Sequence, residues 1–257
     1  MSWLCHPCGR AAPVQLAAVA SHPGTERERP ADALLLPVLL TLTVVAGFLD
    51  AYSFTGTTGT FIANQTGNTV LIGVRLADGQ LGDSWPPVAA VAAFLVGGML
   101  SSLLVTGVEP PKRPARLLAS ELALLVGYLV VVVAAVGTHT GRATGGTLLA
   151  LIVLSALAMG IQTAVIRNVR GTGVSTTFTS GMVAEVGHLM GILMIRGEQR
   201  RATEVRASIV AAAVLTYVGG AALGALSADG ASWGLLAPIG AVAFVLAGVV
   251  VQNSAPR

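Results

Sequence analysis

Six stretches of about 20 residues, the length that crosses the hydrocarbon core of a bilayer, are almost wholly apolar in this chain. They are residues 33–53, 86–107, 116–137, 147–167, 206–226 and 232–251. Only 11% of the 257 residues are charged, whereas a water-soluble domain carries about 25%. A transmembrane β-barrel is excluded because its strands alternate apolar and polar residues over about ten positions. The sequence therefore predicts an all-α, multi-pass membrane protein whose main partner is the lipid bilayer.

Two further apolar segments, residues 61–76 and 174–195, are interrupted by polar side chains and glycine. Loop charges decide how they are counted, because Lys and Arg gather on the cytoplasmic side of a membrane protein. If both segments enter and leave on one side and the N-terminus is cytoplasmic, only Arg75 and Arg142 lie outside. The inner cations are then Lys112, Arg113, Arg116, Arg167, Arg170, Arg196, Arg200, Arg201 and Arg206. If segment 61–76 alone spanned, the Lys112–Arg116 cluster would move outside. We therefore predict six full spans plus two broken or re-entrant segments, with both termini cytoplasmic.

Residues 1–31 differ from the rest in composition, with repeated prolines and the charged run TERERP. We expect a disordered tail there, followed by a transmembrane domain over residues 32–257. Cys5 and Cys8 form one isolated CxxC, which without a second pair does not predict a metal or redox site, and no cofactor is expected. The net charge of +3 comes with no basic stripe or aromatic platform, so no nucleic-acid partner is expected.

The two halves of the chain, about residues 33–137 and 147–251, resemble each other weakly. GFLDA at 47–51 aligns with GIQTA at 160–164, and TGNTVLIG at 66–73 aligns with SGMVAEVG at 180–187. VGG at 96–98 aligns with VGG at 218–220. Each half contains three spans and one broken segment, and because three is odd the halves have opposite orientations. This pattern predicts the inverted repeat of many secondary transporters; the alternative is similarity that arises from shared composition.

Three segments, GFLDAYSF from Gly47, TGNTVLIG from Thr66 and MGIQTA from Met159, resemble the YoaK family of bacterial integral membrane proteins, which carry a domain of unknown function. The resemblance covers residues 33–252 and implies a location in the bacterial inner membrane, but no reaction. The family often has Asn after the glutamine and a Thr-Gly pair in the second half. Here Thr163 and Ser180-Gly181 stand at those places, so equal roles for the two halves are not implied.

The polar residues near the end of the first span are the first candidate site. Asp50 is either a proton or cation site or an interfacial cap of the following turn, because an ionisable group near the membrane must be paired or hydrated. In TGTTGTFIANQTGN, residues 55–68, glycines permit irregular backbone, and Asn64 or Thr66 could cap a half-helix that begins near Gly67. Such backbone is tolerated only inside protein or beside a water-filled cavity. This favours a cavity lining, which would include Asn68, over an external loop followed by a packed helix.

The second half contributes the other candidates. Gln162 lies deep in the fourth span and needs a hydrogen-bond partner, and Thr179, Ser180 and Gly181 are the counterparts of the first-half cluster. Glu185 and His188 share a helix face, which indicates an interfacial pair, a pair lining a path, or one quarter of a di-metal site. No metal is expected, because further carboxylate ligands are lacking.

The small-xxx-small patterns Gly98-x-x-x-Ser102 and Gly220-x-x-x-Gly224 predict close helix packing. The helices could belong to one subunit or to two subunits of a homo-oligomer. Motifs of soluble enzymes are missing, so we expect a small-solute transporter or permease rather than an enzyme. Its site would combine Asp50, the residues around Asn68, Gln162 and the Ser180 region. The alternatives are a membrane-embedded enzyme that uses Asp50, Glu185 and His188, and a structural or sensory subunit.

Overall fold

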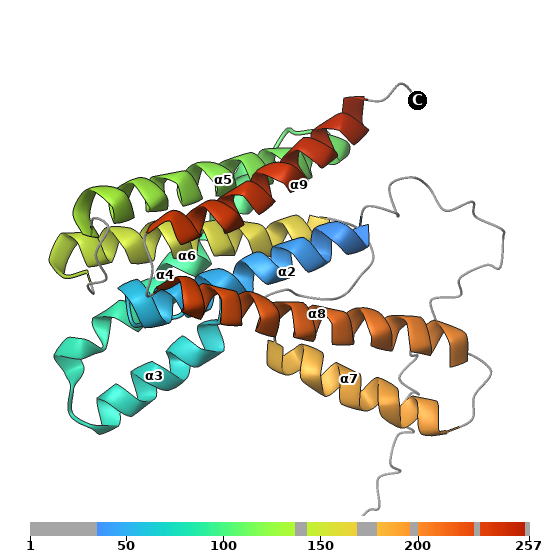
Figure 1. Cartoon of the computed structure of the whole chain (residues 1–257), viewed down its shortest axis with the longest axis horizontal. Coiled ribbons are helices and arrows are strands. Elements are labelled where there is room, and N and C mark those ends of the chain that lie inside the picture. Colours follow the sequence, from blue (N-terminus) through green and yellow to red (C-terminus); the bar gives the residue numbers. More distant parts are fainter. Residues whose placement is uncertain (1–34, 137–142, 169–178, 196–199, 229–231, 255–257) are drawn as a thin grey trace, which may run out of the picture.

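The computed structural model describes residues 35–136, 143–168, 179–195, 200–228 and 232–254, and every element in these ranges is a helix (Figure 1). The predicted N-terminal tail lies outside them. Six helices are long and apolar enough to cross a membrane, which confirms the six predicted spans. They are α2 (Leu35–Tyr52, extended by a π-helix over Ser53–Thr57), α4 (Trp85–Leu104), α5 (Arg113–Val131, extended by a π-helix over Val132–Val136), α6 (Gly145–Asn168), α8 (Arg200–Ala228) and α9 (Leu236–Ser254).

Proline and glycine mark several helix boundaries. Pro86 and Pro87 stand in the first turn of α4, where a missing amide proton costs nothing because it would have no partner in the helix. Gly79 and Gly107 follow α3 (Gln65–Ala77) and α4 and have φ of 72° and 71°. Glycine adopts this left-handed conformation without the clash that a side chain would cause. These residues explain why the chain turns between spans here.

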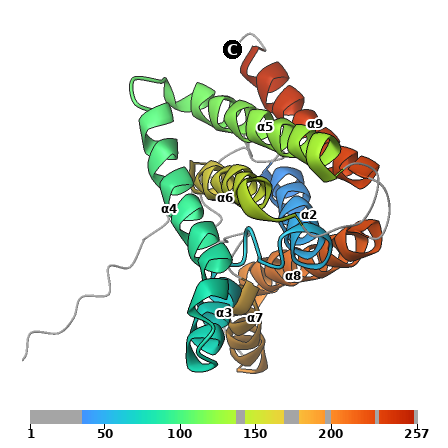
Figure 2. The same cartoon turned by 90° about the vertical axis from the view of Figure 1, so that its left-hand side faces the viewer.

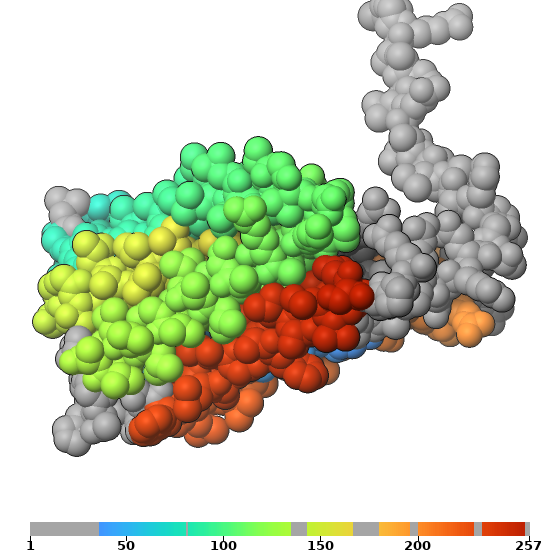
Figure 3. All heavy atoms as spheres, turned by 90° about the horizontal axis from the view of Figure 1, so that it is seen from above, coloured from blue at the N-terminus to red at the C-terminus, as the bar shows by residue number. Residues whose placement is uncertain are grey.

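Helices α2 and α6 form the centre of the bundle (Figure 2). In the apolar stretch of each of them 61% of the residues are buried, against 22% to 33% in the other four spans. Helix α2 packs mainly on α8, and α6 packs on α4 and α5. Figure 3 shows α5 and α9 side by side over one face of the molecule. The peripheral spans therefore present apolar side chains to lipid, while the two central ones face protein.

Glycines allow α2 and α8 to touch through their backbones. An added Cβ at Gly220 would lie 2.2 Å from the carbonyl oxygen of Val44, and one at Gly224 would lie 2.1 Å from that of Phe48. On the other side of the crossing, a Cβ at Gly47 would lie 2.1 Å from the carbonyl oxygen of Tyr217. The predicted close packing at Gly220 and Gly224 is thus used within the chain, so these glycines are not available to an oligomer.

Helices α4 and α6 cross in the same manner. A Cβ at Gly97 would lie 2.4 Å from the carbonyl oxygen of Leu157, and one at Gly160 would lie 2.3 Å from that of Phe94. The packed glycine is therefore Gly97 rather than Gly98, which has open space around it. A contact between subunits through Gly98 and Ser102 stays a prediction.

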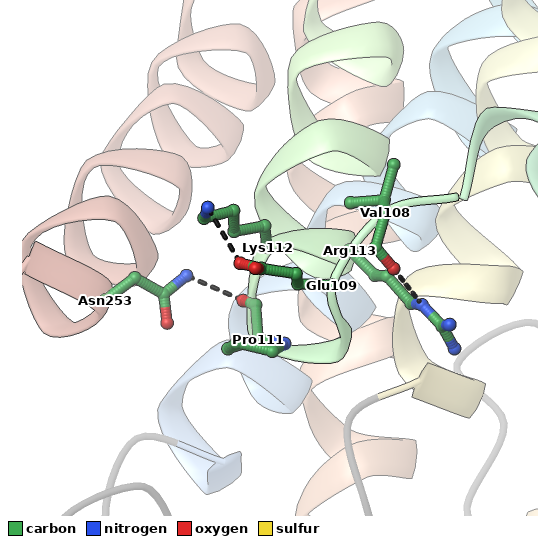
Figure 4. A network of polar contacts seen from close by, with 6 residues as sticks. All are labelled: Val108, Glu109, Pro111, Lys112, Arg113 and Asn253. Carbon is green, nitrogen blue, oxygen red and sulfur yellow. Dashed lines mark hydrogen bonds and ion pairs between the residues drawn. The ribbon is translucent and has the colours of Figure 1, made fainter. Parts of the chain in front are cut away.

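The loop between α4 and α5 and the end of α9 lie at one end of the bundle (Figure 4). The side-chain amide of Asn253 donates a hydrogen bond of 2.7 Å to the carbonyl oxygen of Pro111. Lys112 pairs with Glu109 at 2.8 Å, and Arg113 donates to the carbonyl oxygen of Val108. We call this end, which also holds the starts of α2 and α8, the Lys112 end.

Two helices are shorter than the spans: α3 has 13 residues and α7 (Thr179–Met194) has 16. At about 1.5 Å per residue they reach roughly 20 and 24 Å, which is less than the hydrocarbon thickness of about 30 Å. Helix α3 packs on α4, and α7 packs on α8. In Figure 1 α7 lies toward the Lys112 end and α3 toward the opposite end. These are the two interrupted segments predicted from the sequence.

Candidate functional site

The segment that follows α2 is held by buried hydroxyl groups. The Oγ atom of Ser53 lies 2.7 Å from Oγ1 of Thr58, which in turn lies 3.0 Å from Oγ1 of Thr60. Oγ1 of Thr57 lies 3.1 Å from the hydroxyl of Tyr128 on α5. The threonine-rich composition is therefore explained by the irregular backbone, whose polar groups need partners where water is absent.

Asp50 organises the next part of this segment. The residue is 2% exposed, and its Oδ1 atom accepts hydrogen bonds from the backbone amides of Ile62, Ala63 and Asn64 at 2.7, 2.7 and 3.2 Å. The Oδ2 atom accepts a hydrogen bond from the hydroxyl of Tyr217 on α8. Both oxygens are thus occupied by donors from the protein. Asp50 is therefore buried and binds amides 12 to 14 residues further along, which differs from an interfacial cap of the following turn and gives the segment an anchor in two helices.

The anchor also shows the path of the chain. Asp50 precedes Thr57, the last residue of the π-helix, by seven positions, which corresponds to about 10 Å along a helix. Residues 62–64 must therefore turn back beside α2 to reach this carboxyl group. Helix α3 begins at that depth and leads toward the end of the bundle where α4 begins. The segment 61–76 thus has the form of a re-entrant loop and half-helix.

Asn68 fixes the loop to the start of α3. Its Oδ1 accepts from the amide of Phe61 at 3.0 Å, and its Nδ2 donates to the carbonyl oxygen of Phe61 at 2.6 Å and to Oε1 of Gln65 at 2.9 Å. Asn68 is fully buried. Asn64 is the N-cap of α3, since its Oδ1 accepts from the amide of Gly67 at 3.1 Å. The predicted cap is thus made by Asn64, and not by Thr66.

Gly67 and Phe61 form the packed side of this turn. A Cβ at Gly67 would lie 2.8 Å from the ring of Phe61, which stacks on Phe54 with a centroid separation of 4.5 Å. A residue with a side chain would therefore displace the aromatic pair. Thr66, in contrast, is exposed. Of the first-half candidates, Thr66 is the most exposed, and Asn64 is half-buried.

Gln162 lies elsewhere in the bundle. Its side chain is fully buried, and its Nε2 donates to the carbonyl oxygen of Leu42 on α2 at 3.0 Å, while its Oε1 has no hydrogen-bond partner. Leu42 precedes Asp50 by eight residues, about 12 Å along α2. The structure therefore does not place Gln162 in the Asp50 cluster.

The second-half candidates lie on α7. Thr179 begins this helix, and Ser180 and Gly181 are exposed in its first turn. Glu185 forms an ion pair of 2.6 Å with Arg206 of α8, while His188 is exposed. Glu185 thus pairs with an arginine on another helix. The pair of Glu185 and His188 suggested by the sequence stays a prediction.

Asp50 and Glu185 contact α8 far from each other. Asp50 binds Tyr217 and Glu185 binds Arg206, and these two residues are separated by eleven positions, or about 16 Å along a helix. The polar groups required for the enzyme alternative are therefore attached to different parts of α8. Within the described ranges there is also no group of three or more His, Cys, Asp or Glu side chains that could hold a metal ion.

Three polar side chains of the bundle were not among the residues predicted from the sequence. Tyr217 and Tyr128 were not expected to take part, although a tyrosine within an apolar span is a usable signal, because its hydroxyl needs a partner when buried. Glu121 lies in the first half of α5, and its side chain is fully buried in the bundle. Its orientation depends on how α5 packs, which a local pattern does not give.

Comparisons with known proteins agree with this membrane architecture. The sequence model of a family described as "Protein of unknown function (DUF1275)" matches residues 38–249. The chain is 25% identical over 192 residues to the UPF0700 transmembrane protein YoaK of Bacillus subtilis (strain 168), which covers 74% of this chain and 82% of that protein. No solved structure matches the chain. The resemblance expected from the three sequence segments is confirmed.

Proposed function

This chain belongs to the DUF1275 family of proteins of unknown function, and from that premise we propose that it is a permease for a small solute, built from two inverted three-helix halves. The observation that carries the proposal is a set of backbone contacts that recur between the halves. Inverted repeats with broken helices are the plan of many secondary transporters, whose sites lie near the bilayer midplane.

The first pair of recurring contacts involves the first span of each half. Gly47 of α2 lies against the carbonyl oxygen of Tyr217, and Gly160 of α6 lies against that of Phe94. Gly160 follows Gly47 by 113 positions, and Tyr217 follows Phe94 by 123. Both members of the contact therefore have counterparts in the other half.

The second pair repeats these offsets. Gly220 of α8 lies against Val44, and Gly97 of α4 lies against Leu157. Positions 44 and 157 again differ by 113, and positions 97 and 220 again differ by 123, so the packed glycines shift the VGG alignment made from the sequence, which pairs Gly98 with Gly220, by one position. If the halves were similar only in composition, the two contacts would not be expected to share the same pair of sequence offsets, 113 and 123. The recurrence supports a common ancestor for the halves.

The directions of the helices support an inverted relation. At the Lys112 end α2 begins and α6 ends, α4 ends and α8 begins, and α5 begins and α9 ends. Each helix thus runs opposite to its counterpart. The half-helices fit the same scheme, because α3 packs on α4 and α7 packs on the counterpart helix α8.

The candidate residues take two roles in this proposal. Asp50, Asn64, Gly67 and Asn68 position the re-entrant segment, since their polar groups or close packing are used by the loop itself. The solute contacts are Thr66 and the start of α7 with Ser180 and Gly181, which are exposed, whereas Gln162 is fully buried and bound to Leu42 and therefore has a structural role. An exposed hydroxyl at the start of each half-helix suits a polar or anionic solute, because helix N-termini carry partial positive charge.

Efflux from proteoliposomes tests the proposal even though the solute is unidentified. Vesicles that contain the purified chain are loaded with a bacterial small-molecule extract, and the solutes that leave are identified by mass spectrometry. We expect at least one solute to leave faster than from protein-free vesicles. We expect Thr66→Val to slow that efflux while the protein elutes as a folded species in gel filtration.

Thr69→Val is the matched control, because Thr69 is exposed on the same helix and its hydroxyl bonds within the helix to Gln65. Efflux should be unchanged in this variant. The permease proposal fails if no solute leaves faster than from protein-free vesicles. The site assignment fails if Thr66→Val and Thr69→Val both transport like the wild type.

A further inference from the structure

Glu121 on α5 is a buried carboxyl group without a hydrogen-bond partner. Its side chain is fully buried, and neither Oε1 nor Oε2 contacts a donor. Within the described part of the chain, one other buried side-chain oxygen or nitrogen shares this property, the Oε1 of Gln162. Buried polar atoms are paired in the great majority of cases, so these two side chains require an explanation.

Glu121 and Gln162 lie at similar depth in the bundle. Helices α5 and α6 are antiparallel neighbours, and a Cβ at Gly127 would lie 3.7 Å from the side chain of Leu154. Glu121 lies six residues before Gly127, and Gln162 lies eight residues after Leu154. At about 1.5 Å per residue both lie on the same side of this contact, roughly 9 and 12 Å away from it.

Both side chains also face the interior of the bundle. Glu121 shares its helix face with Leu125 and Tyr128, because residues four and seven apart lie on one side of a helix. The hydroxyl of Tyr128 reaches Thr57 in the π-helix that follows α2, and the amide of Gln162 reaches Leu42 on α2. The orphan oxygens therefore lie on buried faces of the neighbouring helices α5 and α6.

No described cation faces Glu121 from the helices packed around it. Helices α4, α9 and the part of α6 from Gly145 to Ile166 contain no Asp, Glu, His, Lys or Arg. On α5 itself Arg113 and Arg116 lie near the Lys112 end, with Arg113 bound to Val108. Helix α2 contributes Asp50, whose oxygens are taken by other donors, and Tyr52. An ionised Glu121 would therefore be a buried, uncompensated charge, which is strongly unfavourable in a membrane.

We propose that Glu121 binds a proton inside the membrane domain, and that the resulting hydroxyl is the donor that Oε1 of Gln162 lacks. One proton neutralises the carboxylate and supplies a hydrogen bond. A metal cation suits the site less well, because ions such as Ca²⁺ take six or more oxygen ligands, and the orphan oxygens here are three. This inference goes beyond the proposed function and stands without any transport activity.

Labelling with the hydrophobic reagent dicyclohexylcarbodiimide tests the proposal, because the carboxylic O–H adds across the carbodiimide and only the protonated acid reacts. The full-length protein in vesicles is labelled at several pH values, and adducts are located by peptide mass spectrometry. We expect an adduct on Glu121 near neutral pH that declines as the pH is raised. Asp50 is the internal control: it is equally buried, but both of its oxygens are hydrogen-bonded, so it should stay unlabelled.

Three outcomes would overturn the proposal: no adduct on Glu121, equal labelling of Asp50, or protection of Glu121 when sodium chloride replaces choline chloride, which indicates a metal cation. Because the adduct is located in the wild-type chain, the test does not depend on the folding of Glu121→Gln. Gln162→Leu tests the second half of the proposal. It should reduce the labelled fraction of Glu121 at a given pH, and unchanged labelling would remove Gln162 from the site.

Discussion

Three backbone amides and one tyrosine hydroxyl donate hydrogen bonds to Asp50. Asp50→Ala would leave the three amides unpaired in the protein interior, where each costs about 1–3 kcal/mol, so we expect a loss of about 3 kcal/mol or more. Tyr217→Phe removes one donor and should cost about 1–2 kcal/mol. Asp50→Asn should lie between them, because its carbonyl oxygen can still accept from the amides. Thermal unfolding in detergent, followed by circular dichroism, would measure this order, and an unchanged midpoint for Asp50→Ala would contradict it.

Asn68 uses both ends of its amide group, and this makes a second prediction at the residue scale. Asn68→Asp keeps the size and the acceptor for Phe61, but replaces the donor by an oxygen that faces the carbonyl of Phe61 and Oε1 of Gln65. We expect this variant to unfold at a lower temperature than the wild type and no higher than Asn68→Ala, because a buried charge beside two acceptors is unfavourable.

Thr69→Ala provides the comparison for Asn68, since Thr69 is exposed on the same half-helix. A surface substitution of this kind usually changes stability by less than about 0.5 kcal/mol. The role assigned to Asn68 would be wrong if Asn68→Asp and Thr69→Ala had the same unfolding midpoint as the wild type.

At the scale of helices, the crossings of α2 with α8 and of α4 with α6 predict that neighbouring glycines differ in how well they tolerate substitution by alanine. Gly220→Ala and Gly97→Ala place a Cβ within 2.4 Å of a facing carbonyl oxygen, so the helices must separate. We expect each variant to lose about 1–3 kcal/mol of stability, the usual cost of overpacking. The yield of folded protein from membranes and its unfolding midpoint would report the loss.

Gly219→Ala and Gly98→Ala are the matched controls, because each stands next to a packed glycine and has open space around it. Alanine also favours the helix over glycine, so these variants should be as stable as the wild type or slightly more stable. If Gly219→Ala were as harmful as Gly220→Ala, the packing described for α8 against α2 would be incorrect.

At the scale of the whole molecule, the charges predict how the bundle is inserted. All Lys and Arg residues that the structure describes, apart from Arg75, lie toward the Lys112 end, and the positive end of a membrane protein faces the cytoplasm. We expect Asp78→Cys, in the turn after α3, to react with an impermeant maleimide in intact bacterial cells. Glu109→Cys, in the loop between α4 and α5, should react only after lysis. Cys5 and Cys8 are replaced by Ser in both, and the reverse labelling pattern would refute the orientation.

The number of spans and the two short segments follow from the sequence alone. Apolar length is a local property that adds along the chain, so stretches such as 86–107 predict a span whatever their neighbours are. Likewise, Asn64 and Gly67 stand three residues apart, and a cap at this spacing depends on local geometry only. The prediction that a half-helix begins near Gly67 is therefore confirmed. Only the structure shows that Asn64, and not Thr66, is its cap.

The partners of the buried polar groups came only from the tertiary structure. Asp50 meets Tyr217 across 167 positions of sequence, and Gln162 meets Leu42 across 120. Such pairs depend on which helix faces meet, and in α6 and α8 nearly every face is apolar, so periodicity does not reveal the facing side. Glu121 shows the same limit: its position in a span was visible, but the absence of a partner was not. The sequence determined membrane insertion and local capping, because both depend on nearby residues, while the packed arrangement of α2, α5, α6 and α8 decided which polar groups are satisfied.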